Sequence, residues 1–131
     1  MKALVVDDSV VMRKVLIGAL GRANITDVDQ APEGKEAVDA MMATDYTLVL
    51  MGWNMPNVRG IDAVRAIRAA GKTMPIIMVT TEAEKSRVIE ALSAGANDYV
   101  IKPFEPATII SKIQEVLAKA KPKVVGIVMA E

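Results

Sequence analysis

The sequence predicts an α/β fold, a doubly wound sheet of five parallel strands with helices on both of its faces. Five short apolar runs alternate along the chain with five longer stretches in which apolar residues recur at helical spacing. Strands that are separated by helices of roughly 10–15 residues pair in parallel, and right-handed crossovers distribute the helices over both faces of the sheet. One domain of ordinary size accommodates this pattern in 131 residues.

The first part of the chain contains two pairs of strand and helix. The apolar residues 3–6 predict a buried strand, and the helix that follows it ends near Gly21. The predicted inner face of this helix consists of Val11, Met12, Val15, Leu16, Ala19 and Leu20. Residues 25–29 predict the second strand, and residues 33–43 predict the second helix. The predicted inner face of the second helix consists of Ala37, Val38, Met41 and Met42.

The middle of the chain contains its most continuous apolar run. This run, residues 47–51, predicts a central strand that is buried on both faces. Residues 60–70 predict a helix in which Val64 and Ile67, three positions apart, share the inner face. Residues 75–79 are again apolar and predict the fourth strand.

The last part of the chain contains two helices and a short strand. Residues 85–94 predict a helix with Val88 and Leu92 on its inner face. Residues 99–101 predict the fifth strand. Apolar residues at helical spacing in residues 106–120 then predict the last helix.

Composition and charge exclude several classes of function. The chain has 16 basic and 16 acidic residues, so no charge excess indicates binding to nucleic acid or to an anionic membrane. Because cysteine and histidine are absent, the chain has no disulfide, no thiolate metal site, no Ser-His-Asp triad and no histidine to carry a phosphoryl group. No apolar run reaches the ~18–20 residues that span a membrane, and the start lacks a signal-peptide pattern. We expect a cytoplasmic protein without membrane insertion.

Polar side chains that suit phosphate chemistry stand at the ends of the predicted strands. Asp7 and Asp8 follow the first strand, Thr80 follows the fourth and Lys102 follows the fifth. Parallel sheets bind ligands outside the carboxyl ends of their strands, so these residues are predicted to share one site. Adjacent carboxylates suit Mg²⁺, and a hydroxyl with an ammonium suits a phosphoryl group. Taken singly, each residue has a plainer reading as a helix cap, a solvated turn or a surface charge.

A resemblance to a known family is carried by five short motifs. The motifs are Leu4-Val5-Val6-Asp7-Asp8, Trp53-Asn54-Met55-Pro56, Val79-Thr80, Ala94-Gly95-Ala96, and Tyr99 with Lys102-Pro103-Phe104. In this order and spacing the chain resembles the receiver domains of two-component response regulators, and most of all the stand-alone, CheY-like kind that serves chemotaxis. The resemblance covers roughly residues 2–118 and implies a flavodoxin-like receiver fold, with residues 1–120 as the receiver domain and residues 121–131 as a C-terminal tail.

The resemblance also implies roles for the residues at the strand ends. By analogy with the family, Asp7, Asp8 and the backbone carbonyl of Asn54 would bind Mg²⁺. The Thr80 hydroxyl and the Lys102 ammonium would contact the phosphoryl group. A receiver of this kind accepts phosphate from a kinase and is a signalling module rather than an enzyme.

An output face and two partners follow from the same resemblance. The ring of Tyr99 would change its exposure as the threonine hydroxyl moves, on a face that includes Glu82, Lys85 and Lys112. The implied partners are a sensor histidine kinase and a downstream output protein such as a flagellar motor component.

One position departs from the family. Gly52 stands directly before the Trp-Asn-Met-Pro stretch, where receivers have the aspartate that accepts the phosphoryl group. Because glycine has no side chain, it cannot form an acyl phosphate, so the sequence predicts a phosphorylation-deficient receiver. With one carboxylate fewer, Mg²⁺ binding is expected to weaken, and Lys102 is expected to turn toward Asp7 or Asp8.

Other interpretations remain open at this point. The chain could instead be an interaction module that works without phosphorylation, through the same output face. A flavodoxin-like, flavin-binding protein or a dinucleotide-binding protein is disfavoured because neither a Gly-x-Gly-x-x-Gly turn nor a loop rich in serine or threonine follows the first strand. Residues 122–131 read as an apolar strand, which is either a linker or an extra strand that pairs within the molecule or in a homodimer.

Overall fold

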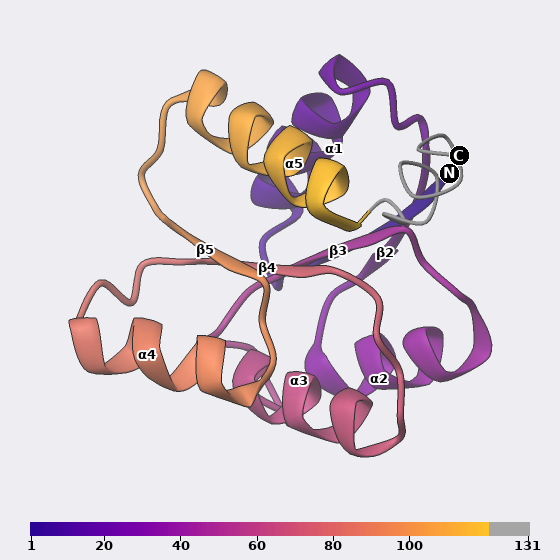
Figure 1. Ribbon diagram of the computed structural model, residues 1–131, viewed down its shortest axis with the longest axis vertical. Coiled ribbons are helices and arrows are strands. Elements are labelled where there is room, and N and C mark those ends of the chain that lie inside the picture. Colours follow the sequence, from indigo (N-terminus) through magenta and orange to yellow (C-terminus); the bar gives the residue numbers. More distant parts are fainter. Residues whose placement is uncertain (121–131) are drawn as a thin grey trace, which may run out of the picture.

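The computed structural model describes residues 1–120, in which strands and helices alternate (Figure 1). The elements in chain order are β1 (Lys2–Val6), α1 (Val10–Arg22), β2 (Asp27–Ala31), α2 (Gly34–Ala43), β3 (Leu48–Met51), α3 (Gly60–Ala69), β4 (Ile76–Thr80), α4 (Lys85–Ala94), β5 (Asp98–Ile101) and α5 (Pro106–Ala120). The predictions for residues 121–131, which were an extra strand, a linker and a homodimer contact, lie outside the described residues.

The five strands form one parallel sheet in the order β2-β1-β3-β4-β5. Helices α1 and α5 cover one face of this sheet, and α2, α3 and α4 cover the other (Figure 1). The predicted fold class, a flavodoxin-like doubly wound α/β sheet, is therefore confirmed. The strand order reverses direction next to β1, so the carboxyl ends of β1 and β3 flank the place where such sheets bind ligands.

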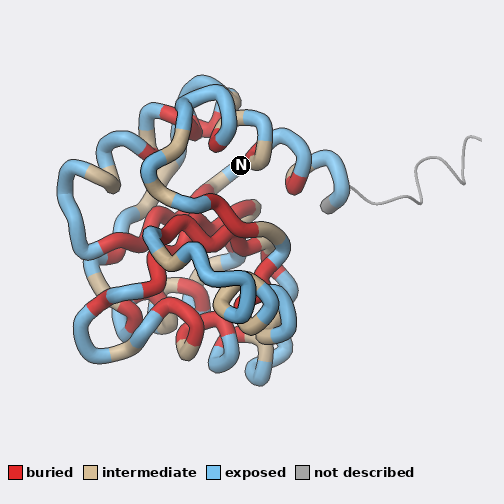
Figure 2. Tube along the Cα trace, turned by 90° about the vertical axis from the view of Figure 1, so that its left-hand side faces the viewer, coloured by how far each residue is buried: buried red, intermediate tan, exposed pale blue. Residues whose placement is uncertain are grey.

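The three inner strands supply the centre of two apolar layers. All residues of β3 and β4 and the last four residues of β1 are buried. Alternate side chains along these strands point to opposite faces of the sheet. One set packs under α2, α3 and α4, and the other set packs under α1 and α5. Figure 2 shows the buried stretches gathered at the middle of the molecule. A parallel sheet that is covered on both faces requires such continuous apolar strands, and this is why these runs were recognisable in the sequence.

The second strand is the one whose predicted bounds were wrong by more than a single residue. The apolar residue Ile25 suggested a start at residue 25, whereas β2 spans Asp27–Ala31. Asn24 adopts the left-handed conformation with a φ of 66°, and the N–H of Ile25 donates to the carbonyl of Leu20 at 2.9 Å. These features are those of a Schellman-type helix end, in which the apolar residue packs beneath the helix that it terminates. Ile25 is accordingly buried at the end of α1 and not in the sheet.

Four residues that were predicted on inner helix faces are exposed. Val11, Val15, Met42 and Leu92 have relative exposures of 72%, 45%, 51% and 45%. Three of them were paired in the prediction with an adjacent apolar residue, such as Leu16 beside Val15. Adjacent helical residues point about 100° apart, so usually one member of such a pair reaches the core. Within residues 1–120 no helix is long and apolar enough to cross a membrane.

Candidate functional site

A pocket of about 230 Å³ lies at the carboxyl ends of β1, β3, β4 and β5. Its lining consists of Asp7, Asp8, Gly52, Trp53, Asn54, Thr80, Thr81 and Lys102. The structure therefore brings together the residues that the sequence assigned to a metal and to a phosphoryl group. Tyr99, Glu82, Lys85 and Lys112, which were assigned to an output face, do not line this pocket.

Asp7 is the most buried charged residue of the pocket. It follows the last residue of β1 and is 2% exposed. One carboxylate oxygen, Oδ1, accepts a hydrogen bond from the N–H of Ser9 at 2.9 Å. Ser9 in turn caps α1, because its hydroxyl oxygen accepts from the N–H of Met12 at 3.1 Å. The cap thus fixes the turn that carries Asp7. An N–H of this turn donates a hydrogen bond to one of the two oxygens of the buried carboxylate.

The other oxygen of Asp7 forms an ion pair with Lys102. The distance from Lys102 Nζ to Asp7 Oδ2 is 2.8 Å, and the two side chains are 19% and 3% exposed. A buried carboxylate needs a partner of this kind, because leaving it unpaired costs several kcal/mol. Lys102 follows β5, and its N–H donates to the carbonyl of Thr80 at 2.8 Å. Of the two partners expected for Lys102, the structure selects Asp7.

Thr80 is the last residue of β4 and is 2% exposed. Its hydroxyl oxygen accepts a hydrogen bond from the N–H of Glu82 at 3.2 Å. A hydroxyl that accepts one bond keeps its own proton, so Thr80 can donate into the pocket. The sequence placed this threonine just after the strand, whereas it ends the strand.

Gly52 lies directly after β3 and lines the pocket, next to Asp7 in the turn that follows β1. Its N–H donates to the carbonyl of Val6 at 2.8 Å, which continues the pairing of β3 with β1. A Cβ atom at position 52 would lie 3.3 Å from the oxygen of Val6 and 3.4 Å from Oδ2 of Asp7. Any side chain at this position would therefore begin beside the Asp7 carboxylate, inside the pocket.

The oxygen donors around Gly52 suit one hard cation. Asp8 and Asn54 are exposed and line the same pocket as the buried Asp7. Mg²⁺ is held in proteins by one or two carboxylates together with carbonyl oxygens and retained waters, so this donor set fits the ion. Across residues 1–120 the structure has no group of three or more carboxylates, cysteines or histidines that could hold a metal. An ion in this pocket would therefore also need carbonyl oxygens and waters as ligands.

Tyr99 is connected to the pocket through Glu82. The tyrosine lies in β5, is 9% exposed, and its hydroxyl donates to the backbone carbonyl of Glu82 at 2.7 Å. The N–H of the same Glu82 donates to the hydroxyl of Thr80. One short segment therefore contacts both side chains. Burial, and to a lesser degree the charge of Glu82, raises the pKa of the Tyr99 hydroxyl.

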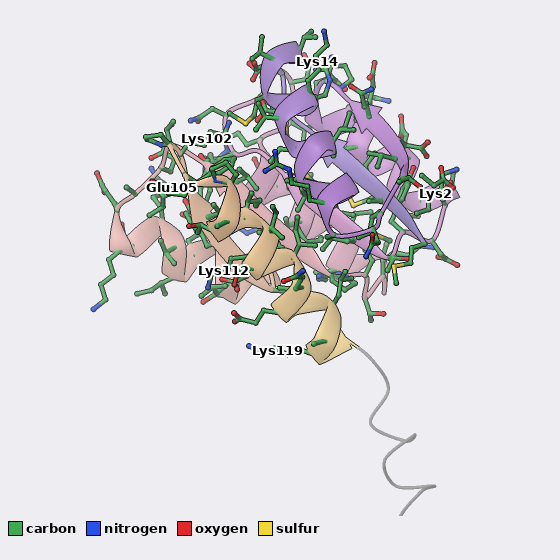
Figure 3. The ribbon with its side chains drawn as sticks, turned by 90° about the horizontal axis from the view of Figure 1, so that it is seen from above. Lys2, Lys14, Lys102, Glu105, Lys112 and Lys119 are labelled. Atoms are coloured by element: carbon green, nitrogen blue, oxygen red, sulfur yellow. The ribbon has the colours of Figure 1, made fainter. Side chains whose placement is uncertain are left out.

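The two lysines assigned to the output face lie on the helices beside β5. Lys85 is exposed and begins α4. Lys112 lies on α5, and its Nζ is 3.3 Å from Oδ2 of Asp98, the first residue of β5. In Figure 3 Lys102 and Glu105 lie near the start of α5, and Lys112 lies further along it. Lys85, Tyr99 and Lys112 thus lie on α4, β5 and α5, and Glu82 lies in the segment between β4 and α4.

Two arginines that contact residues of the pocket without lining it were missed by sequence reasoning. The guanidinium carbon of Arg87, on α4, lies 5.7 Å from the ring centroid of the buried Trp53. Arg13, on α1, donates a hydrogen bond to the backbone carbonyl of Asp7 at 2.7 Å. No pattern distinguishes Arg87 from other charged helix residues. The position of Arg13 one turn after the cap Ser9 is the signal that could have identified it, because such a residue lies over the turn it follows.

Residues 3–114 match the model of the response regulator receiver domain, and the chain belongs to this family. The fold and the pocket at its carboxyl edge agree with that assignment.

Within this family the chain is homologous to chemotaxis proteins. It is 45% identical over 120 residues to the CheY homolog of Campylobacter jejuni, covering 89% of this chain and 92% of the relative. It is 46% identical over 120 residues to chemotaxis protein CheY1 of Helicobacter pylori, covering 89% and 97%.

Solved structures give the same result. The receiver domain of Francisella response regulator 1452 superposes with a TM-score of 0.85 at 27% identity, over 92% of this chain and 98% of that one. Vibrio cholerae chemotaxis protein CheY4 superposes with a TM-score of 0.80 at 32% identity, over 88% and 97%.

Proposed function

We propose that this chain is a CheY-like receiver of a two-component phosphorelay in which Gly52 has replaced the phosphoacceptor aspartate, so that the domain is phosphorylation-deficient. The observation that carries the proposal is the position of Gly52. A side chain there would start 3.4 Å from Asp7 Oδ2, in a pocket that Thr80 and Lys102 also line. Residues 1–120 are the receiver unit in this proposal.

The absence of a carboxylate at position 52 explains why the proposed domain cannot accept a phosphoryl group. Phosphoryl transfer to a receiver forms an oxygen–phosphorus bond at a carboxylate while the bond from phosphorus to the donor breaks. Gly52 offers no oxygen for that bond. In a chain with aspartate at position 52, the Thr80 hydroxyl and the Lys102 ammonium would stabilise the negative charge on the phosphoryl oxygens.

Magnesium is part of the proposed function. Asp7, Asp8 and the backbone carbonyl of Asn54 would hold the ion, which supplies positive charge to the phosphoryl oxygens when it is bound. Two features of this chain weaken that binding. The third carboxylate is absent at Gly52, and the ammonium of Lys102 already neutralises Asp7 at 2.8 Å.

The proposed partners are those of a chemotaxis regulator in the cytoplasm, namely a sensor histidine kinase and a flagellar motor component. Tyr99, Glu82, Lys85 and Lys112 would form the output face toward the motor component. The link from Thr80 through Glu82 to Tyr99 supports a coupling between the pocket and this face, because both side chains bond to one backbone segment.

A second function uses the same face without phosphate. In this alternative the chain is an interaction module whose binding does not depend on the state of the pocket. The observation that favours it is the inward Tyr99, which is 9% exposed with its hydroxyl already bonded, in a chain that cannot be phosphorylated at position 52.

Restoring aspartate separates the two functions. The present chain and its Gly52→Asp variant would each be given Mg²⁺ and acetyl phosphate, and the fluorescence of Trp53 would be followed. The receiver proposal expects a donor-dependent change in the variant and none in the present chain. A variant that stays unresponsive would indicate that the pocket no longer supports phosphorelay chemistry, and would favour the interaction module.

A further inference from the structure

Arg13 ties three elements together beside the pocket. It lies in the first turns of α1 and is half-buried. Its Nη1 donates to the backbone carbonyl of Asp7 at 2.7 Å, and its Nε donates to Oε1 of Gln30, in β2, at 3.0 Å. One rigid guanidinium therefore connects the turn after β1 to the neighbouring strand. Lys14, the next residue, has no part in these contacts and is exposed.

The carbonyl that Arg13 holds belongs to the peptide unit between the two acidic residues. Because a peptide unit is planar, fixing the oxygen of Asp7 also fixes the N–H of Asp8 and the direction in which the Asp8 chain leaves the turn. The Asp7 side chain is fixed separately, by Ser9 and Lys102. Asp8 is exposed at the pocket, so the orientation of this peptide sets the direction from which its side chain enters the site.

We infer that Arg13 is a positioning residue for the divalent cation. It holds the peptide between Asp7 and Asp8 so that both carboxylates face one ion. The inference rests on the proposed function, since it concerns the Mg²⁺ site named there. It adds a residue that neither lines the pocket nor would touch the ion.

The direction in which Mg²⁺ affinity changes when Arg13 is removed distinguishes a positioning role from a purely electrostatic one. A guanidinium near a cation site repels the cation, so its removal would tighten Mg²⁺ binding if charge alone mattered. A positioning role has the opposite consequence, because the carboxylates lose their arrangement when the hydrogen bond to the Asp7 carbonyl is lost. Groups that orient metal ligands contribute roughly 10–100-fold to affinity. We expect about a tenfold weaker Mg²⁺ affinity for Arg13→Met, at the low end of that range.

The test is a MgCl₂ titration of the full chain and of Gly52→Asp, each with Arg13, with Arg13→Met and with Arg13→Lys. Trp53 fluorescence is one readout, and competition with Mn²⁺ followed by electron paramagnetic resonance is the second. Arg13→Lys keeps the charge but loses the planar two-nitrogen contact, so it should weaken binding less than Arg13→Met. Arg22→Met removes an exposed cation from the last turn of the same helix and should leave the affinity unchanged. Circular dichroism of each variant checks that it is folded.

Each outcome of the titration either supports or contradicts the positioning role of Arg13. Weaker binding in Arg13→Met, with partial recovery in Arg13→Lys, supports the positioning role. Equal or tighter binding in Arg13→Met overturns it while leaving the magnesium site intact. Absence of Mg²⁺ binding in both chains that retain Arg13 contradicts the magnesium part of the proposed function and, with it, this inference. If Arg13→Met does not fold, Arg13→Lys alone decides, and an affinity equal to that of the parent chain overturns the inference.

Discussion

Strand β1 has a charged cluster at each end, and the two clusters differ in how deeply they are buried. At the amino end, Lys2 and Asp29 are 3.6 Å apart with side chains 39% and 43% exposed, and the hydroxyl of Tyr46 donates to Asp29 at 2.7 Å. At the carboxyl end, Lys102 and Asp7 are 2.8 Å apart with side chains 19% and 3% exposed. Both clusters pair a lysine with an aspartate, but only the carboxyl end withdraws its charges from water.

The difference in burial shows that the fold removes an ion pair from water at the carboxyl end of β1 and not at its amino end. A solvated pair such as Lys2 with Asp29 contributes about 0–1 kcal/mol and can be lost with little consequence. A buried pair contributes little net stability over apolar residues, yet it becomes strongly destabilising when one partner is removed. The buried pair at the carboxyl edge therefore fits the proposed phosphoryl and metal site, where charge would serve binding and not stability.

The largest expected effect is at the buried pair. Lys102→Met leaves the carboxylate of Asp7 buried without its ammonium partner, so we expect the free energy of unfolding to fall by about 3 kcal/mol. Urea denaturation at pH 7 measures the change. Adding Asp7→Asn removes the orphaned charge and should recover most of the loss. A single Lys102→Met variant as stable as the parent would show that the pair is not buried in solution as it is in the structure.

The second effect concerns the coupling of stability to Mg²⁺. Gly52→Asp supplies a third carboxylate beside Asp7, so the folded variant should bind Mg²⁺ more tightly than the present chain. Saturating Mg²⁺ should then raise its free energy of unfolding by about 1–2 kcal/mol more than it raises that of the present chain. The measurement is urea denaturation with MgCl₂ and with EDTA. Equal stabilisation of the two chains would contradict the expected weakening of Mg²⁺ binding by Gly52.

The third effect tests the amino-end cluster through pH. Burial, and then the hydrogen bond to Asp29, raises the pKa of Tyr46 to about 12. An acid whose pKa is raised on folding stabilises the fold fully below its unfolded pKa of about 10, and this contribution is lost as the pH rises through its folded pKa. Between pH 9 and pH 11 the present chain should therefore lose about 1 kcal/mol more than Tyr46→Phe does. A parallel loss in both chains would mean that the tyrosine ionises normally in the fold.

The smallest effect is expected at the exposed pair. Lys2→Met removes the ammonium partner of Asp29, whose carboxylate remains solvated and bonded to Tyr46. The free energy of unfolding should change by less than about 0.5 kcal/mol. Urea denaturation under the conditions used for Lys102→Met gives a direct comparison. A loss as large as that of Lys102→Met would remove the contrast between the two ends of the strand.

The sequence predicted the features that depend on continuous burial or on the ends of strands. β1, β3 and β4 were recognisable because a sheet covered on both faces needs uninterrupted apolar runs. Asp7 and Lys102 could be expected in one site because the carboxyl ends of parallel strands share an edge. The position of Gly52 within that site followed from its place directly after β3.

The features that were missed depend on tertiary packing. Ile25 is as apolar as a strand residue, and only the left-handed turn at Asn24 places it under α1. Val11 and Met42 are apolar yet exposed, because the direction of a helix face is set by the neighbouring elements. The choice of Asp7 over Asp8 by Lys102, and the contact of Arg13 with the Asp7 carbonyl, depend on distances between segments far apart in the chain.

In the proposed function, Gly52 alone prevents phosphorylation of an otherwise intact pocket. The decisive measurement is intact-mass spectrometry of the present chain and of Gly52→Asp, each incubated with Mg²⁺ and acetyl phosphate. We predict one added phosphoryl group on the variant and none on the present chain, because only the variant has a carboxylate at that position. A phosphoryl adduct on the present chain would contradict the claim, since another carboxylate, Asp7 or Asp8, would then be the acceptor.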